Sequence, residues 1–124
     1  MSYEFFSDAE LTCKCGCAQQ KMHDDFMVKV IELRRKCGFP FPVSSAYRCP
    51  THNRKVSSSG LTGAHTTGRA IDIAVQGAQA RMLMKVALDM GFTGIGVQQK
   101  GGGRFIHLDD LDAKWGPRPN VWSY

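Results

Sequence analysis

The chain has 124 residues, enough for one compact domain with a buried core and too few for two domains of ordinary size. Hydrophobic residues make up 43% of it and charged residues 22%, a balance that excludes the disordered, fibrous and membrane classes. The formal net charge of +5 favours anionic partners, which include nucleic acid and the anionic polymers of a bacterial cell wall.

No targeting or nucleic-acid signal stands out. The N-terminal stretch MSYEFFSDAELTC lacks the basic start and apolar run of a signal peptide, and no later stretch approaches the length of a transmembrane helix. We therefore expect cytoplasmic synthesis without a signal peptide, and no membrane partner. There is no run of five Lys or Arg residues and no basic helix with interleaved aromatic residues, so nucleic acid is not an expected partner.

Two helices are predicted in the first third of the chain. SDAE has the pattern of a capping box, with Ser7 as N-cap and Glu10 three residues later, and predicts a short helix. A longer helix is predicted over residues 24–37, because apolar residues recur there at three- and four-residue spacing. Acidic residues begin this segment, basic residues end it, and Gly38 is suited to the C-cap.

Five cysteines stand at positions 13, 15, 17, 37 and 49. An odd number without a secretion signal argues against a disulfide framework and for mostly reduced thiols. The one-residue gaps of CKCGC differ from the two- to four-residue gaps of zinc knuckles. Adding Cys49 and His52 would make a structural zinc site across two segments, but the spacing favours buried free thiols or a single disulfide. We therefore expect activity not to require the cysteines.

The rest of the chain predicts short strands alternating with helices. FPFPVSSAYR predicts a proline-bounded turn into a strand, and PTHNRKVSSSGLTG a helical turn followed by a loop. GRAIDIAV predicts a buried strand, AQARMLMKVALDMG an amphipathic helix, and GIGVQQKGGGRFIHLDDL two strands with a Gly-rich connection. GIGVQQ lacks the third glycine and the following helix of a dinucleotide-binding fingerprint, so its glycines are interpreted as strand glycines. We predict an α+β fold with a small antiparallel sheet packed against helices.

Three residues in the second half have the types that bind a catalytic zinc ion. His65 and Asp72 lie at the two ends of a passage from loop to strand, and their side chains converge if the chain turns at Gly68. In FIHLD, the alternation of a strand places His107 and Asp109 on one face. Two imidazoles and one carboxylate leave a fourth position for water, unlike the closed, cysteine-rich set of structural sites. Taken singly, a histidine on a strand is more often a hydrogen-bonded core or surface residue than a metal ligand, and the aspartate after AI is also compatible with a turn cap.

The stretches SAYRCPTHN, HTTGRAIDI and RFIHLDD together resemble the zinc D-alanyl-D-alanine carboxypeptidase family of cell-wall metallopeptidases. That family includes phage endolysins and shares its fold with Hedgehog signalling domains. The resemblance covers residues 40–110 and implies a Hedgehog/DD-peptidase-like fold in one catalytic domain over 1–124, with residues 1–20 as a cysteine-containing N-terminal segment. It implies that the zinc ligands are His65, Asp72 and His107. It also implies that Arg48 polarises the scissile carbonyl or holds a substrate carboxylate.

The sequence departs from the family at the general base. Many relatives carry a glutamate three residues before the last histidine ligand, but Arg104 occupies that position here and cannot accept a proton. Asp109 is the nearest alternative, since it can reach either the metal-bound water or the ring nitrogen of a ligand histidine. Gly63 replaces the small hydroxyl residue that the family has two positions before the first ligand.

These observations predict a zinc-dependent peptidoglycan peptidase. It would act as a monomer on the amide bonds of stem peptides, after release to the cell wall, as a D-Ala-D-Ala carboxypeptidase or a cross-bridge endopeptidase of phage or bacterial origin. One alternative is a non-hydrolytic assembly or wall-binding protein with the same fold and zinc, and another is a nucleic-acid protein built on the cysteines. The aromatic residues of the C-terminal RPNVWSY either line the cleft or close the core, and we expect them to close the core.

Overall fold

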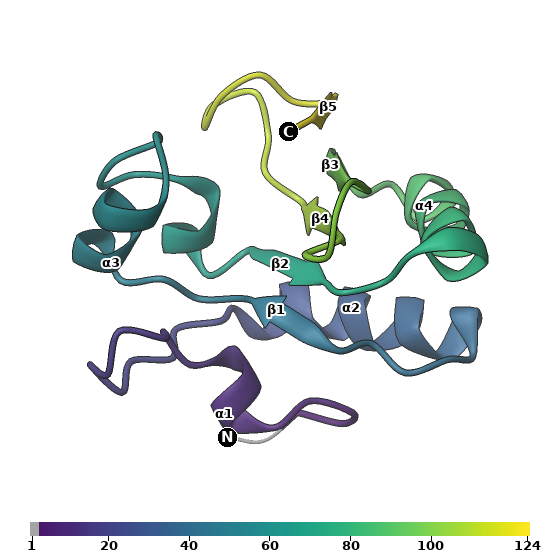
Figure 1. Cartoon of the computed structure of the whole chain (residues 1–124), viewed down its shortest axis with the longest axis horizontal. Coiled ribbons are helices and arrows are strands. Elements are labelled where there is room, and N and C mark those ends of the chain that lie inside the picture. Colours follow the sequence, from purple (N-terminus) through teal and green to yellow (C-terminus); the bar gives the residue numbers. More distant parts are fainter. Residues whose placement is uncertain (1–2) are drawn as a thin grey trace.

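A computed structural model describes residues 3–124 as a five-stranded sheet with helices on both faces (Figure 1). The strands are β1 (Val43–Ser45), β2 (Ala70–Ile73), β3 (Gly94–Gln98), β4 (Phe105–Asp109) and β5 (Asn120–Ser123). The helices are α1 (Asp8–Leu11), α2 (Asp24–Cys37), α3 (Pro50–Val56) and α4 (Gly77–Asp89), with the 3-10 turn η1 (Ala64–Thr67). The predicted α+β fold is confirmed.

The sheet has the order β1-β2-β4-β3-β5. The pairs β1–β2, β2–β4 and β3–β4 are antiparallel, as predicted, whereas β5 adds to β3 in parallel. The sequence analysis did not predict β5, because its residues are mostly exposed and lack a buried alternating face. Its position depends instead on the loop that returns the chain from β4 to the free edge of β3.

Local signals place the helices where the sequence predicted them. The capping box between Ser7 and Glu10 is present in α1, and α2 has the predicted bounds. Gly38 ends α2 in the left-handed conformation at φ 76°, and its backbone N–H donates to the Arg34 carbonyl. In the part of the chain that the structure describes, no helix is both long enough and apolar enough to cross a membrane.

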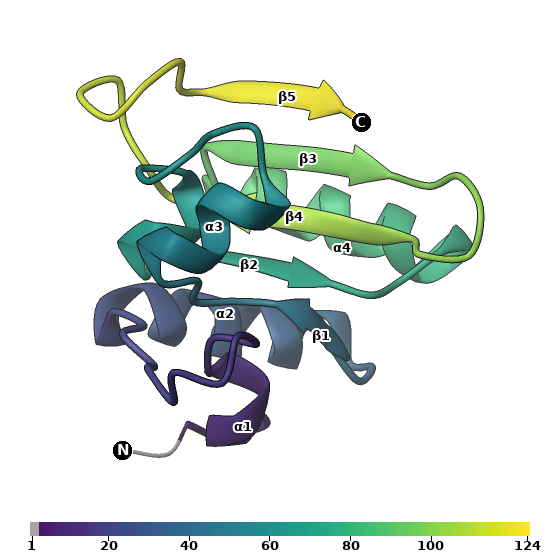
Figure 2. The same cartoon turned by 60° about the vertical axis from the view of Figure 1, so that its left-hand side comes forward.

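The core lies between one face of the sheet and the helices α2 and α4, which pack side by side behind the strands in Figure 2. Ile106 and Leu108 of β4 point into this core and are completely buried. Because side chains alternate along a strand, His107 and Asp109 point to the opposite face, on the side of α3. One face of β4 therefore contributes to the hydrophobic core, and the other face carries the candidate functional residues.

Candidate metal centre and cleft

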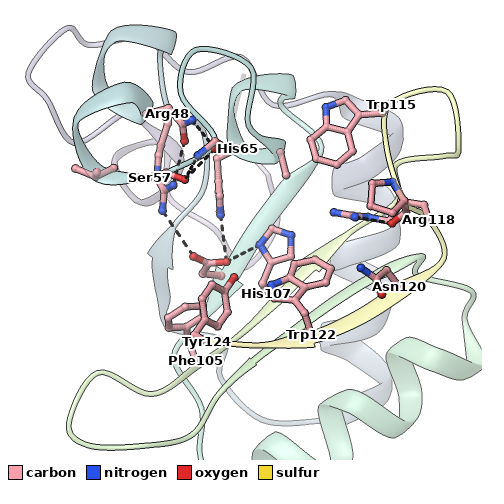
Figure 3. Close-up of a pocket in the computed structure, with 16 residues that line it drawn as sticks. Arg48, Ser57, His65, Phe105, His107, Trp115, Arg118, Asn120, Trp122 and Tyr124 are labelled. Carbon is pink, nitrogen blue, oxygen red and sulfur yellow. Dashed lines mark hydrogen bonds and ion pairs between the residues drawn. The ribbon is translucent and has the colours of Figure 1, made fainter.

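The three candidate zinc ligands come together at the floor of a cleft (Figure 3). Asp72 of β2 and His107 of β4 are directly opposite in the sheet, and His65 projects from η1. His65 Nε2 lies 3.2 Å and His107 Nδ1 lies 2.9 Å from Asp72 Oδ1. Ligand atoms about 2.0–2.2 Å from a tetrahedral zinc ion lie about 3.3–3.5 Å from one another. The two separations here are slightly shorter, so the three donors are close enough to share one zinc ion after a small outward shift.

A tight turn and a hydrogen bond fix the orientation of His65. Gly68 ends η1 at φ 77°, and a Cβ atom there would lie 2.0 Å from the carbonyl oxygen of Lys21, so only glycine fits. The predicted turn at Gly68 is therefore present. His65 Nδ1 donates to the Ala46 carbonyl at 2.7 Å, which leaves the lone pair of Nε2 directed at Asp72.

Asp109 contacts the other ring nitrogen of His107. Its Oδ2 accepts from His107 Nε2 at 2.7 Å, and the carboxylate also accepts from Arg118 Nε at 2.9 Å and Arg118 Nη2 at 2.7 Å. Burial raises the pKa of Asp109, but the hydrogen bonds from His107 and Arg118 outweigh burial and lower the pKa to about 2. Asp109 is completely buried and does not line the cleft.

The two aspartates act together on the protonation of His107. Burial lowers the pKa of His107, but the hydrogen bonds to Asp109 and Asp72 outweigh it and raise the pKa above its ordinary value. Burial likewise raises the pKa of Asp72, while the two histidines hold it well below its usual range. Asp72 is therefore ionised between the two histidines, which is the form of a carboxylate that binds a cation.

Arg48 lies beside the candidate ligands. Its Nη2 is 4.0 Å from Asp72 Oδ2, while Nε donates to Ser45 Oγ and Nη1 donates to Asn53 Oδ1, both at 3.1 Å. The Asn53 amide in turn donates to Ser59 Oγ at 2.9 Å. Sequence analysis missed Asn53. Its side chain is almost fully buried, so its amide group needs hydrogen-bond partners within the protein, and it finds them in Arg48 and Ser59. The guanidinium is thus held at the cleft wall.

The cleft has a volume of about 510 Å³ and contrasting walls. Polar side chains line it around Arg48, and aromatic side chains line the opposite part (Figure 3). Trp122 packs on His107 and Tyr124 packs on Phe105, each with ring centroids 5.1 Å apart. The expectation that the C-terminal aromatic residues close the core is wrong for these two, because β5 adds at the sheet edge beside the cleft and leaves Tyr124 57% exposed.

Arg118 is the main residue of this centre that the sequence did not indicate. Its guanidinium lies over the rings of Trp115 and Trp122, at 4.8 and 4.7 Å from their centroids, while it pairs with Asp109. No local spacing predicts this contact, because the loop after β4 brings Arg118 back beside Asp109. Arg118 thus connects the aromatic wall to the residue behind His107.

The strand glycines of GIGVQQ make room for the candidate centre. A Cβ atom at Gly94 would lie 2.2–2.4 Å from the carboxyl group of Asp109. A Cβ atom at Gly96 would lie 2.7 Å from Trp122 Nε1 and 3.0 Å from His107 Cβ. The side chains of Asp109, Trp122 and His107 therefore require glycine at these two positions of β3.

We expect Gly94→Ala to weaken both folding and zinc binding. The added methyl group displaces the carboxylate of Asp109 from His107 and Arg118, and overpacking of this kind costs about 1–3 kcal/mol. The matched control is Gly102→Ala, because a Cβ atom at Gly102 meets open space. Thermal unfolding and zinc titration measure the two effects. Equal unfolding temperatures and zinc affinities in both variants would contradict this account of Gly94.

Arg104, at the position where many relatives have glutamate, lies outside the cleft. It is exposed in the connection between β3 and β4, and its Nε donates to the Gly101 carbonyl at 2.9 Å. Of the residues that the structure describes, Asp72 contributes the only carboxylate that lines the cleft. Among the described residues, the cleft therefore has no lining carboxylate that could accept a proton without also being a candidate metal ligand.

The fold and the donor set define a class: a small α+β protein with a candidate mononuclear zinc centre in an open cleft. A family model described as peptidase M15 matches residues 4–109. The chain therefore belongs to the peptidase M15 family of zinc-dependent metallopeptidases. The match begins well before residue 40, so it includes the N-terminal cysteine segment as well as the stretches that carry the resemblance. A comparison with curated proteins gives no match.

Proposed function

We propose that this M15 family member is a zinc-dependent peptidoglycan peptidase that hydrolyses an amide bond of a stem peptide or cross-bridge. The observation that carries the proposal is the convergence of His65, Asp72 and His107 at the floor of an open cleft. Three protein donors leave a coordination position for water, which distinguishes catalytic from structural zinc sites. A volume of about 510 Å³ is within the usual range for a small-molecule or short peptide ligand.

Arg48 and the aromatic wall supply the other interactions of this proposal. When bound, zinc lowers the pKa of a coordinated water and polarises a carbonyl group. Arg48, held by Ser45 and Asn53, stabilises negative charge on the carbonyl oxygen or pairs with a substrate carboxylate. Trp122 and Tyr124 offer apolar surface to alanine methyl groups. The net charge of +5 favours approach to an anionic wall.

We infer that Asp109 orients His107 and does not take the proton from water. Its carboxylate bonds to Nε2 of the imidazole, whereas the candidate donor Nδ1 faces Asp72. Both oxygens of Asp109 also accept from Arg118, and Asp109 itself does not line the cleft. This is the carboxylate–histidine–metal arrangement that fixes a ligand's tautomer and raises its basicity.

A non-hydrolytic wall-binding protein is the second candidate function. It is favoured by one observation: within residues 3–124, the cleft has no lining carboxylate besides the candidate ligand Asp72. General-base catalysis contributes about 10²- to 10⁴-fold to rate, so a centre without a base binds its peptide but turns it over slowly or not at all.

Digestion of purified peptidoglycan tests both functions. With zinc-loaded protein, we expect mass spectrometry of the muropeptides to show one water added for each bond cleaved. Loss of a terminal D-alanine identifies a carboxypeptidase, and separation of cross-linked dimers identifies an endopeptidase. The His65→Ala variant is the inactive control.

Intact muropeptides together with zinc-dependent retention on sacculi would instead support the wall-binding protein. If the protein neither cleaves muropeptides nor is retained on sacculi, both proposals are contradicted.

A further inference from the structure

A second group of metal-ligating side chains lies outside the cleft, where the N-terminal segment meets the start of α3. The Sγ atoms of Cys13, Cys15, Cys17 and Cys49 all lie within 4.8 Å of one another. Cys13 Sγ is 3.5 Å and Cys49 Sγ is 3.6 Å from Cys15 Sγ. A disulfide requires about 2.05 Å, whereas four thiolates at about 2.3 Å from a zinc ion lie about 3.8 Å apart. The two sulfur–sulfur distances are close to the separation expected in a tetrahedral zinc site, and all four sulfur atoms lie near enough to share one ion.

We propose that Cys13, Cys15, Cys17 and Cys49 bind a structural zinc ion, distinct from the metal of the cleft. Four cysteine ligands make a closed coordination shell, which is the usual composition of a structural zinc site. The side chain of His52, considered with Cys49 in the sequence analysis, is not part of the group. Only the backbone N–H of His52 takes part, donating to Cys49 Sγ at 3.4 Å.

The backbone explains how cysteines with one-residue gaps face one point. Gly16 at φ 91° and Ala18 at φ 62° are both left-handed, so the chain reverses sharply within CKCGCA. The N–H of Cys13 donates to the Gln19 carbonyl at 2.8 Å and closes this loop. The spacing rule for zinc knuckles does not cover such a loop, which is why the sequence favoured free thiols.

The surroundings of the sulfur atoms suit thiolates. The backbone N–H of Cys49 donates to Cys13 Sγ at 3.3 Å, and hydrogen bonds of this kind stabilise the negative charge of a ligand sulfur. Cys13 and Cys49 are buried, which shields two ligands, while Cys15 and Cys17 are exposed and leave a route for the ion. The cluster therefore combines a formed site with access from solvent.

The position of the cluster gives the ion a structural role. Cys49 directly follows Arg48, and the same segment contains Ala46, whose carbonyl accepts from the candidate ligand His65. A zinc ion joining Cys49 to the N-terminal cysteines would fasten the N-terminal segment to this stretch. The ion would support the cleft without contacting a substrate.

The experiment uses the His65→Ala/His107→Ala double variant, in which the cleft has lost two of its donors. We expect this variant, purified under reducing conditions, to retain one zinc per chain, with X-ray absorption showing four sulfur neighbours at about 2.3 Å. Cobalt substitution should give thiolate-to-cobalt charge-transfer absorption. Because the cleft ligands are removed, the outcome does not depend on whether the protein is a peptidase.

Adding Cys17→Ser to this double variant should remove the remaining zinc or replace one sulfur neighbour by oxygen. Cys37→Ser is the matched control, since Cys37 lies on α2 outside the cluster, and it should leave the zinc content unchanged. A double variant without zinc, a zinc ion with nitrogen and oxygen neighbours only, or a disulfide among the four cysteines in the freshly reduced protein would each overturn the proposal.

Discussion

Loss of the cleft zinc and of peptidase activity is the expected result of His65→Ala and of His107→Ala. Each change leaves only two of the three donors of this centre. The loss of metal affinity should exceed the roughly 10- to 100-fold that removing a hydrogen-bond partner of a ligand costs. Metal analysis should show one zinc fewer per chain, and muropeptide digestion should show no product.

His23→Ala is the matched control for this pair. His23 is exposed at the start of α2, and its side chain makes no capping hydrogen bond, so zinc content and activity should stay at the wild-type level. Retention of the full zinc content and activity in both His65→Ala and His107→Ala would show that the cleft is not the metal centre.

Asp109→Asn should weaken zinc binding by about 10- to 100-fold, and saturating zinc should restore most of the rate. The reason is that the Asp109 carboxylate holds Nε2 of His107 and leaves Nδ1 for the metal. A general base would behave differently: zinc would stay bound while the rate fell by about 10²- to 10⁴-fold at any zinc concentration. Zinc titration together with the rate as a function of zinc separates the two roles.

Stability gives a second measure of Asp109→Asn. Arg118 loses the charged partner that it contacts through Nε and Nη2, so the thermal unfolding temperature should fall as well. Asp112→Asn is the control, because Asp112 is exposed and caps only a local turn through the Lys114 N–H. Wild-type zinc affinity, rate and unfolding temperature in Asp109→Asn would rule out both the orienting and the base role.

The α-helices and the first four strands followed from local sequence patterns, whereas the grouping of His65, Asp72 and His107 as one ligand set was implied by the family resemblance. The cap at Gly38, the turn at Gly68 and the alternation of FIHLD each depend on a few neighbouring residues, and such signals are readable without tertiary structure. Asp72 and His107 then meet because their strands are neighbours in the sheet.

The parts that the sequence did not reveal depend on contacts between distant segments. β5 has little buried surface of its own, and its parallel pairing with β3 brings Trp122 over His107. Arg118 reaches Asp109 only because the loop after β4 brings the chain back beside it. The four-cysteine cluster likewise requires Cys49 to pack on a loop that lies more than thirty residues earlier in the sequence. Patterns of residue spacing within one segment cannot predict such contacts between distant segments.

The direct cross-strand pairing of Asp72 with His107 links metal binding to the alignment of the sheet. A slip of one residue between β2 and β4 would turn one of these side chains toward the helices and bring a core residue such as Ile106 or Leu108 opposite the other. A misaligned molecule then lacks the complete donor set, whereas a zinc ion that binds the aligned molecule would stabilise it by mass action. A zinc ion in the cleft would thus favour the correct strand register, since only chains with correctly paired β2 and β4 would have the donors to bind it.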